Sequence, residues 1–175
     1  MKRTSAALGS FAFLLVTPGT VCGLVPLLIT GWRRPGDPVP WVDALGWLLV
    51  LAGGAVLLHA FVAFAWHGWG TPAPTAPTER LVVQGAYRYV RNPMYVAVVA
   101  VVLGQVLVFG SWGLFAYAVV IALAQAAFVH LYEEPTLREA YGPAYDEFCA
   151  NVPRWLPRIT PWRGTADRRE PVGQR

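Results

Sequence analysis

Residues 85–110, GAYRYVRNPMYVAVVAVVLGQVLVFG, decide how this chain folds, because a polar motif here turns into an almost uncharged apolar run. Asparagine is a favoured N-cap residue and proline is favoured at the first helical position, so Asn92 and Pro93 predict a helix start. Arg88 and Arg91, with the free amides of that first turn, predict an anion-attracting corner. A basic flank that anchors a membrane helix is the alternative interpretation.

The composition of the chain indicates an integral membrane protein. Of its 175 residues, 55% are hydrophobic and 14% are charged, and the mean hydropathy is +0.43. Soluble domains carry about a quarter charged residues. The net charge of +4 does not indicate nucleic-acid binding, because the arginines lie at chain ends and in loops, where membrane orientation explains them. Cys22 and Cys149 match neither a disulfide framework nor a metal-site spacing, so we expect free thiols and no metal.

Four apolar segments have, or nearly have, the length of about 20 residues that a bilayer-spanning helix needs. We therefore predict a single all-α membrane domain over residues 1–162. The predicted spans are residues 6–32, 41–66, 92–111 and 112–132. Helices in the cytoplasmic tail, residues 133–158, should cover a cofactor pocket, and residues 163–175 should be disordered. Only Gly110 and Ser111 separate the last two spans, which must form a tight antiparallel hairpin.

The first apolar segment begins like a signal peptide, with Lys2 and Arg3 before an apolar core. No small-residue cleavage site follows, and the apolar run continues. We expect a retained membrane helix that bends at Pro18 and Pro26.

A second polar stretch, VHLYEEPTLREAYGPAYDEFCANVPRWLPR, occupies residues 129–158. Glu133 and Glu134 precede Pro135 at the expected end of the fourth span, where carboxylates oppose the helix dipole beside the bilayer. Arginines of the first motif, or a ligand, should offset this cost. Because the third and fourth spans form a hairpin, Asn92 and Glu133 should lie at the same face of the membrane. The two motifs should therefore be neighbours in space. Beyond the proline, the sequence predicts two short helices divided by a glycine.

Together the two motifs resemble the isoprenylcysteine carboxyl methyltransferase and phospholipid methyltransferase family over residues 79–160. The resemblance implies a multi-span membrane enzyme that binds S-adenosylmethionine between the hairpin and the tail and methylates a lipophilic, lipid-like acceptor. The family pattern falls on Gly85, Tyr87, Arg88, Arg91, Asn92, Pro93, Tyr95, Glu133, Glu134, Leu137, Tyr141, Gly142, Tyr145, Pro153 and Arg154.

The resemblance and the chemistry of these side chains assign two sets of roles. Arginine forks onto a carboxylate, glutamate accepts from an ammonium or a diol, and tyrosine packs against adenine or a sulfonium. The expected catalytic residues are Arg91, Glu134 and Arg154. The expected cofactor-binding residues are Gly85, Tyr87, Arg88, Asn92, Pro93, Tyr95, Glu133, Glu134 and Tyr145. Glu134 should contact the cofactor, with Arg91 across the pocket from it.

The acceptor atom stays open at this point. A carboxylate acceptor needs an arginine, for which Arg91 or Arg154 is suited, whereas an amine needs desolvation or a base, for which Glu134 is suited. The family often has histidine where this chain has Asn92, which can cap a helix but cannot titrate near neutral pH. His59 is expected to pack, and His130 is a candidate to line the pocket.

Two other functions compete with methyl transfer. Sterol-reductase families have a similar hairpin and an arginine-proline-tyrosine motif but bind NADPH, and this chain is short for them. A non-catalytic membrane scaffold would use the motifs only to stabilise the tail. Neither nucleic acid nor an obligate protein partner is indicated by the sequence.

The distribution of basic residues predicts the topology. With four spans, every lysine and arginine except Arg33 and Arg34 lies on one side, so both termini of this inner- or plasma-membrane protein should be cytoplasmic. A topology reporter fused after Arg175 should therefore be active in the cytoplasm. Reporter activity only outside the cytoplasm would contradict the four-span arrangement.

Overall fold

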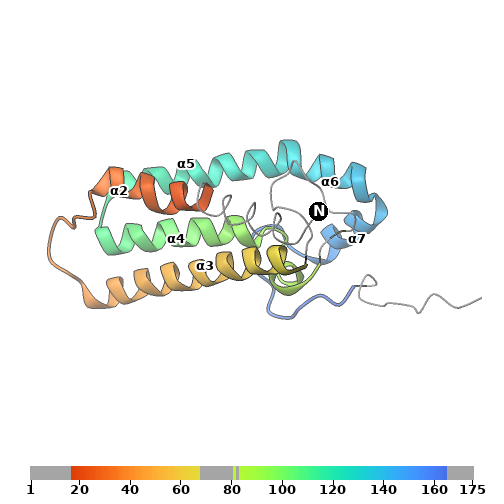
Figure 1. Ribbon diagram of the computed structural model, residues 1–175, viewed down its shortest axis with the longest axis horizontal. Coiled ribbons are helices and arrows are strands. Elements are labelled where there is room, and N and C mark those ends of the chain that lie inside the picture. Colours follow the sequence, from red (N-terminus) through yellow and green to blue (C-terminus); the bar gives the residue numbers. More distant parts are fainter. Residues whose placement is uncertain (1–16, 68–80, 82, 165–175) are drawn as a thin grey trace, which may run out of the picture.

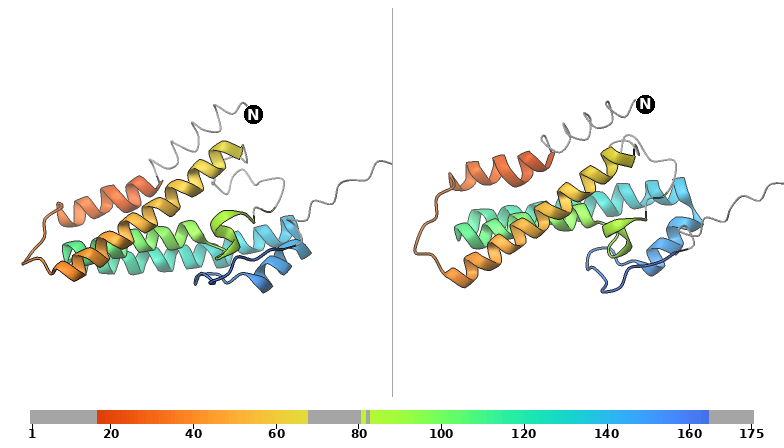
Figure 2. Two further views of the ribbon diagram at one scale, coloured as in Figure 1. Left: turned by 90° about the horizontal axis from the view of Figure 1, so that it is seen from below. Right: turned by 60° about the horizontal axis from the view of Figure 1, so that its bottom comes forward.

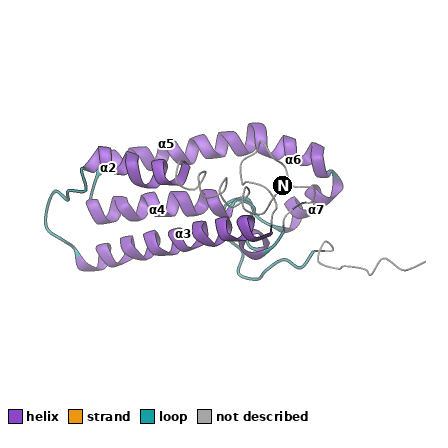
Figure 3. Cartoon of the chain, viewed as in Figure 1, coloured by secondary structure: helices purple, strands orange, loops and turns teal. Residues whose placement is uncertain are grey.

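The structure is a computed structural model that describes residues 17–67, 81 and 83–164. Within these residues the regular elements are helices and no strand occurs (Figure 3). Three long helices, α3 (Pro40–His67), α4 (Pro93–Phe109) and α5 (Trp112–Phe128), run along the long axis of the molecule (Figure 1). The short helix α2 (Val25–Thr30) packs against α4 and α5. The all-α prediction is confirmed.

Two of the described helices, Pro40–Ala60 and Trp112–Tyr141, are long and apolar enough to cross a membrane. Two further apolar helices, Thr17–Thr30 and Pro93–Phe109, are shorter. The second and third predicted spans agree with α3 and α4 to within two residues at each end. Part of the first predicted span and the tail beyond Gly164 lie outside the described residues.

The fourth apolar helix was predicted to end at Glu133 and Glu134, and this prediction was wrong. A π-helical segment, η3 (Val129–Glu133), leads directly from α5 into α6 (Glu134–Tyr141). Proline lacks an amide and clashes with the carbonyl four residues before it. The wider π-turn, closed by the bond from the Glu134 amide to the Val129 carbonyl, carries the chain past Pro135 without a break. Glu133 and Glu134 therefore lie inside a continuous helix and do not face a C-terminal dipole.

The same device occurs in the first apolar segment. The π-helical segment η1 (Thr20–Leu24) lies between Pro18 and Pro26, the two prolines at which a bend was predicted. Pro26 cannot donate to the carbonyls of Val21 and Cys22. Side chains of neighbouring helices take over, as Tyr117 donates to Val21 O at 3.0 Å and Gln105 donates through Nε2 to Cys22 O at 2.6 Å. These bonds satisfy carbonyls that no water would reach inside a bilayer.

The predicted hairpin between the third and fourth apolar segments is confirmed. α4 ends at Gly110, whose positive φ of 59° is a conformation that glycine adopts without a steric penalty. Its amide donates to the Val106 carbonyl at 2.8 Å. Ser111 caps α5 by accepting a hydrogen bond from the Leu114 amide at 3.3 Å.

Helices α3 and α4 approach closely because glycines lie where they cross. A Cβ atom on Gly46 would lie 2.8 Å from the carbonyl oxygen of Gly104, and one on Gly53 would lie 2.7 Å from that of Ala97. Neither position has room for a side chain. This contact fixes α4, and with it the polar motif at its N-terminus.

The polypeptide after the bundle returns to the first motif. Helices α6 and α7 (Pro143–Asn151) confirm the two predicted short helices, with Gly142 between them at a φ of 51°. Residues 152–164, here called the C-terminal strap, then run back along residues 85–92 (Figure 2). The two sequence motifs meet at this end of the bundle.

Adjacent glycines in α3 test the close packing of α3 against α4. Gly53→Ala should destabilise the protein, because the added methyl group would meet backbone atoms of α4. The matched control is Gly54→Ala, because a Cβ atom at this position would meet nothing within 4 Å. This substitution should raise the free energy of unfolding by about 0.5–1 kcal/mol, since alanine favours a helix more than glycine does. Thermal unfolding in detergent measures both changes. Equal effects of the two substitutions would contradict the packing.

Candidate functional site

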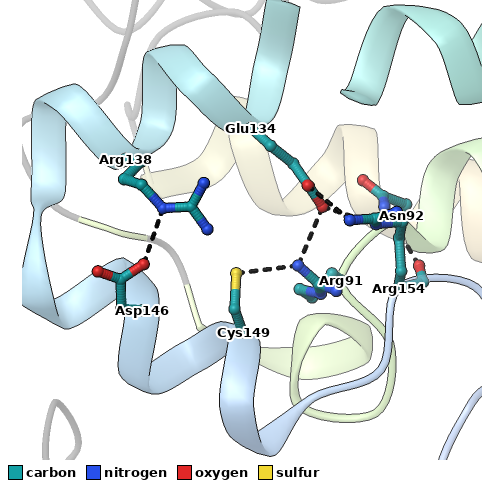
Figure 4. Close-up of polar contacts among 7 residues, drawn as sticks. All are labelled: Arg91, Asn92, Glu134, Arg138, Asp146, Cys149 and Arg154. Atoms are coloured by element: carbon teal, nitrogen blue, oxygen red, sulfur yellow. Dashed lines mark hydrogen bonds and ion pairs between the residues drawn. The ribbon is translucent and has the colours of Figure 1, made fainter. Parts of the chain in front are cut away.

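The candidate site is built around the carboxylate of Glu134, which is 6% exposed (Figure 4). Arg91 donates through Nη1 to Oε1 at 3.0 Å. Arg154 forks onto the same carboxylate, with Nε 2.8 Å from Oε1 and Nη2 2.7 Å from Oε2. One carboxylate thus joins the start of α4, the start of α6 and the C-terminal strap. The three predicted catalytic residues are together, but Arg91 contacts Glu134 directly instead of lying across a pocket from it.

The C-terminal strap is also held through its backbone. The Arg91 amide donates to the Pro153 carbonyl, and the Arg158 amide donates to the Tyr89 carbonyl, both at 2.9 Å. Trp162 and Arg88 form two hydrogen bonds. The Trp162 amide donates to the Arg88 carbonyl, and Arg88 Nε donates to the Trp162 carbonyl at 2.8 Å. The side chain of Arg88, predicted to bind the cofactor, therefore holds the strap.

Asn92 begins α4 as predicted, with Pro93 in the first turn, but its side chain makes no capping hydrogen bond. Asn92 is 7% exposed, and its Nδ2 donates to the Arg154 carbonyl at 3.2 Å. The predicted side-chain cap was wrong, and the side-chain amide donates to the strap instead. The buried side chain of Asn92 therefore orients the residue that forks onto Glu134.

The two adjacent glutamates have different surroundings. The half-buried Glu133 accepts through Oε2 from the Tyr95 hydroxyl at 2.8 Å. Tyr87, in the 3₁₀ segment η2 (Gly85–Arg88), lies close enough to interact electrostatically with the same carboxylate. Burial raises the pKa of Tyr87 above its usual value, and the charge of Glu133 raises it further. Three predicted cofactor residues, Tyr87, Tyr95 and Glu133, therefore form one group, here called the tyrosine–glutamate corner.

Tyr145 lies in an apolar cluster with Phe148 and Val152, and Trp162 of the strap packs against the cluster. Burial is the main reason that the pKa of Tyr145 is raised, with the neighbouring Cys149 contributing next. The Cys149 thiol also accepts from Arg91 Nη1, at 2.9 Å. Cys149 is a free thiol, as predicted, but its contact with Arg91 was missed, because no spacing in the sequence relates residues 58 positions apart.

Gly85 adopts a φ of 56°, and a Cβ there would lie 3.4 Å from Nε2 of His59. The structure thus brings an exposed histidine of α3 to the edge of the first motif. The sequence alone left His59 isolated, because the two residues come from separate segments. His130, the other histidine considered, is exposed on η3.

The site retains unused hydrogen-bonding capacity. Within the part of the chain that the structure describes, Nε of Arg91 is buried and has no hydrogen-bond partner. A buried guanidinium N–H is suited to an acceptor such as a carboxylate. The Glu133 side chain and the tyrosines of the corner suit an ammonium or a sulfonium. No group of three or more metal-ligating side chains occurs among the described residues.

Glu134→Gln tests whether this carboxylate holds the site together. The substitution leaves Arg91, whose side chain is 13% exposed, without its carboxylate. We expect a loss of about 3 kcal/mol in the free energy of unfolding, at the low end for a buried pair because Arg154 is 37% exposed. The control is Asp146→Asn, whose pair with Arg138 is 57% and 54% exposed and should matter by less than about 1 kcal/mol. Equally small changes in melting temperature would contradict this role.

Comparison with known proteins identifies relatives of this chain. The sequence profile of the phospholipid methyltransferase family matches residues 41–144. A phosphatidylethanolamine N-methyltransferase of Botryotinia fuckeliana is 28% identical over 151 residues, which cover 78% of this chain and 15% of that protein. Another, of Schizosaccharomyces pombe, is 27% identical over 127 residues, which cover 67% of this chain and 14% of that protein. The chain thus spans a small fraction of these relatives. No solved structure matches it.

The matched region begins in α3, contains both glutamates and the first motif, and ends at the start of α7. It covers more than half of the chain and confirms the resemblance drawn from the two motifs. The chain belongs to the phospholipid methyltransferase family.

Proposed function

We propose that this protein is a membrane-embedded methyltransferase that uses S-adenosylmethionine to methylate the amine of a phospholipid headgroup. Family membership supports methyl transfer to a lipid. The observation that favours an amine is the pairing of both Arg91 and Arg154 with Glu134. Each of these arginines already pairs with a carboxylate, whereas the tyrosine–glutamate corner offers a carboxylate and aromatic rings suited to a cation.

The outer surface of the helices supports a location in the membrane. Large apolar side chains of α5 and η3 face outward, including Val120, Leu123 and Leu131, which are 61%, 65% and 74% exposed. Lipid chains would cover such a surface. We propose four spans with both termini in the cytoplasm, so that the site lies at the cytoplasmic face of the bilayer.

S-adenosylmethionine supplies an activated methyl group on a positively charged sulfur. Arg91, through its unpartnered Nε, is suited to hold the cofactor carboxylate, and the tyrosines of the corner are suited to lie near positive charge. The protein's contribution would be alignment of donor and acceptor and the exclusion of water. The strap contributes Arg154 and α7 contributes Cys149 to the contacts around Arg91 and Glu134 (Figure 4).

Methyl transfer from labelled S-adenosylmethionine to vesicles of defined headgroup tests this function. The purified protein should label phosphatidylethanolamine and should not label a lipid whose only acceptor is a carboxylate. A non-catalytic scaffold would label neither lipid. Mass spectrometry of the extracted lipids identifies the product.

Ligand-dependent stabilisation separates this proposal from a reductase. At 100 times its dissociation constant, S-adenosylhomocysteine should stabilise the solubilised protein by about 2.7 kcal/mol. NADPH should leave the melting temperature unchanged. Stabilisation by NADPH alone would favour the reductase.

A further inference from the structure

We propose that the tip of the C-terminal strap, residues 155–161, is a lipid-binding element that inserts into the cytoplasmic surface of the bilayer and prefers anionic phospholipids. The proposal assigns a partner to a surface that methyl transfer itself does not use. It rests on the proposed location of the site at the cytoplasmic face of the membrane. Its first test does not depend on the reaction that the protein catalyses.

Two large aliphatic side chains at the tip are left uncovered by the part of the chain that the structure describes. Leu156 is 80% exposed and Ile159 is 97% exposed, and only Pro157 and Arg158 separate them. Pro157 restricts the backbone between them and so limits how far the turn can withdraw either side chain. Exposed apolar side chains that are grouped and bordered by polar residues mark surfaces that bind a membrane or a protein.

The backbone contacts of the strap place its tip at the level where α4 begins. The Arg158 amide donates to the Tyr89 carbonyl at 2.9 Å, and Tyr89 lies just before Pro93, the first residue of α4. In both views of Figure 2 the strap folds back along the long axis of the bundle toward this start of α4. In the proposed four-span arrangement this level is the interface between the membrane and the cytoplasm.

The composition of the strap suits an interface that carries negative charge. Residues 152–164 contain three arginines, two tryptophans and no acidic residue. Arg154 pairs with Glu134, whereas neither Arg158 nor Arg163 forms a salt bridge with any described residue. Tryptophan is enriched at membrane interfaces, and arginine is attracted to the anionic lipids of the cytoplasmic leaflet. Charge complementarity therefore identifies an anionic lipid surface as the partner of the tip.

Contact between the tip and the bilayer has a consequence for the candidate site, because the same strap contributes to both. Arg154, which lies two residues before Leu156, forks onto Glu134. The Arg91 amide donates to the Pro153 carbonyl, so the strap is also fixed to the first motif. A tip held in the bilayer restrains the strap in the position where these contacts form. Insertion of the tip therefore favours the closed form of the cofactor site, and this consequence rests on the proposed function.

Photo-cross-linking tests the lipid contact directly. Benzoylphenylalanine replaces Ile159, and the protein is irradiated in nanodiscs of phosphatidylcholine, either alone or mixed with phosphatidylglycerol. Mass spectrometry should find lipid adducts at this position, with a yield about 3-fold higher or more in the anionic nanodiscs. Position 139, an exposed glutamate on α6, is the matched control and should give few adducts. Position 123, a leucine that is 65% exposed on α5, should give lipid adducts in both nanodiscs.

Arg163→Gln tests the preference for anionic lipid. The substitution removes an exposed positive charge of the strap and leaves the apolar tip intact. The excess of adducts at position 159 in anionic nanodiscs should therefore fall, while the yield in phosphatidylcholine alone should not change. An undiminished excess would show that the arginine does not contribute to lipid recognition.

Polar substitution of the tip tests its effect on the cofactor site. Leu156→Ser combined with Ile159→Ser should weaken the affinity for S-adenosylhomocysteine in anionic nanodiscs by about 5-fold or more. Both side chains are exposed, so the melting temperature in detergent should stay that of wild type. Val39→Ser, which changes an exposed apolar residue before α3, is the control and should alter neither quantity.

Three outcomes of the cross-linking would overturn the proposal. Cross-links from position 159 to this chain, a second copy or another protein would show that protein covers the tip. Equal lipid yields at positions 159 and 139 would exclude specific insertion. Lipid adducts at neither 159 nor 123 would refute the membrane location together with the tip.

The affinity measurement separates the two proposals from each other. Lipid adducts at position 159 with an unchanged affinity in the double serine variant would overturn the coupling to the cofactor site. If wild type binds no S-adenosylhomocysteine, the proposed function fails, and the cross-links still decide whether the tip contacts lipid.

Discussion

The carboxylate of Glu134 is the group on which the rest of the site depends. It accepts hydrogen bonds from guanidiniums 43 residues before it and 20 residues after it, and so connects the first motif to the strap. Removing one partner of a buried ion pair is costly because the remaining charge stays out of water. The backbone bonds between residues 88–91 and the strap add to this connection. The strap, α4 and α6 are therefore held as one unit.

Prolines preceded by π-turns allow helices to continue where they would otherwise stop. Before Pro135 the wider turn η3 keeps α5 and α6 continuous, and this continuity places both glutamates at the end of the bundle. Before Pro26 the carbonyls that lose their donor are bound by Gln105 and Tyr117. These cross-helix hydrogen bonds tie η1 to α4 and α5.

Glu133 and Glu134 have different surroundings although they are adjacent in the sequence. Both carboxylate oxygens of Glu134 accept hydrogen bonds from arginines. The carboxylate of Glu133, bound by the Tyr95 hydroxyl, keeps capacity for a cation. Two adjacent glutamates thus lie in different environments: Glu134 is buried between two arginines, and Glu133 is half-buried beside tyrosines.

The sequence by itself predicted α3, α4, the hairpin and the meeting of the two motifs, but not the continuation of α5 into α6 through a π-turn. Apolar length, Gly110-Ser111 and Asn92-Pro93 are local signals, and local geometry follows from them. Tertiary structure decided which partner each polar side chain takes. Asn92 binds the Arg154 carbonyl instead of capping α4, and Glu134 takes two arginines. The approach of His59 to Gly85 was likewise decided in three dimensions. Such choices depend on distances between segments far apart in the chain, and no sequence period encodes those distances.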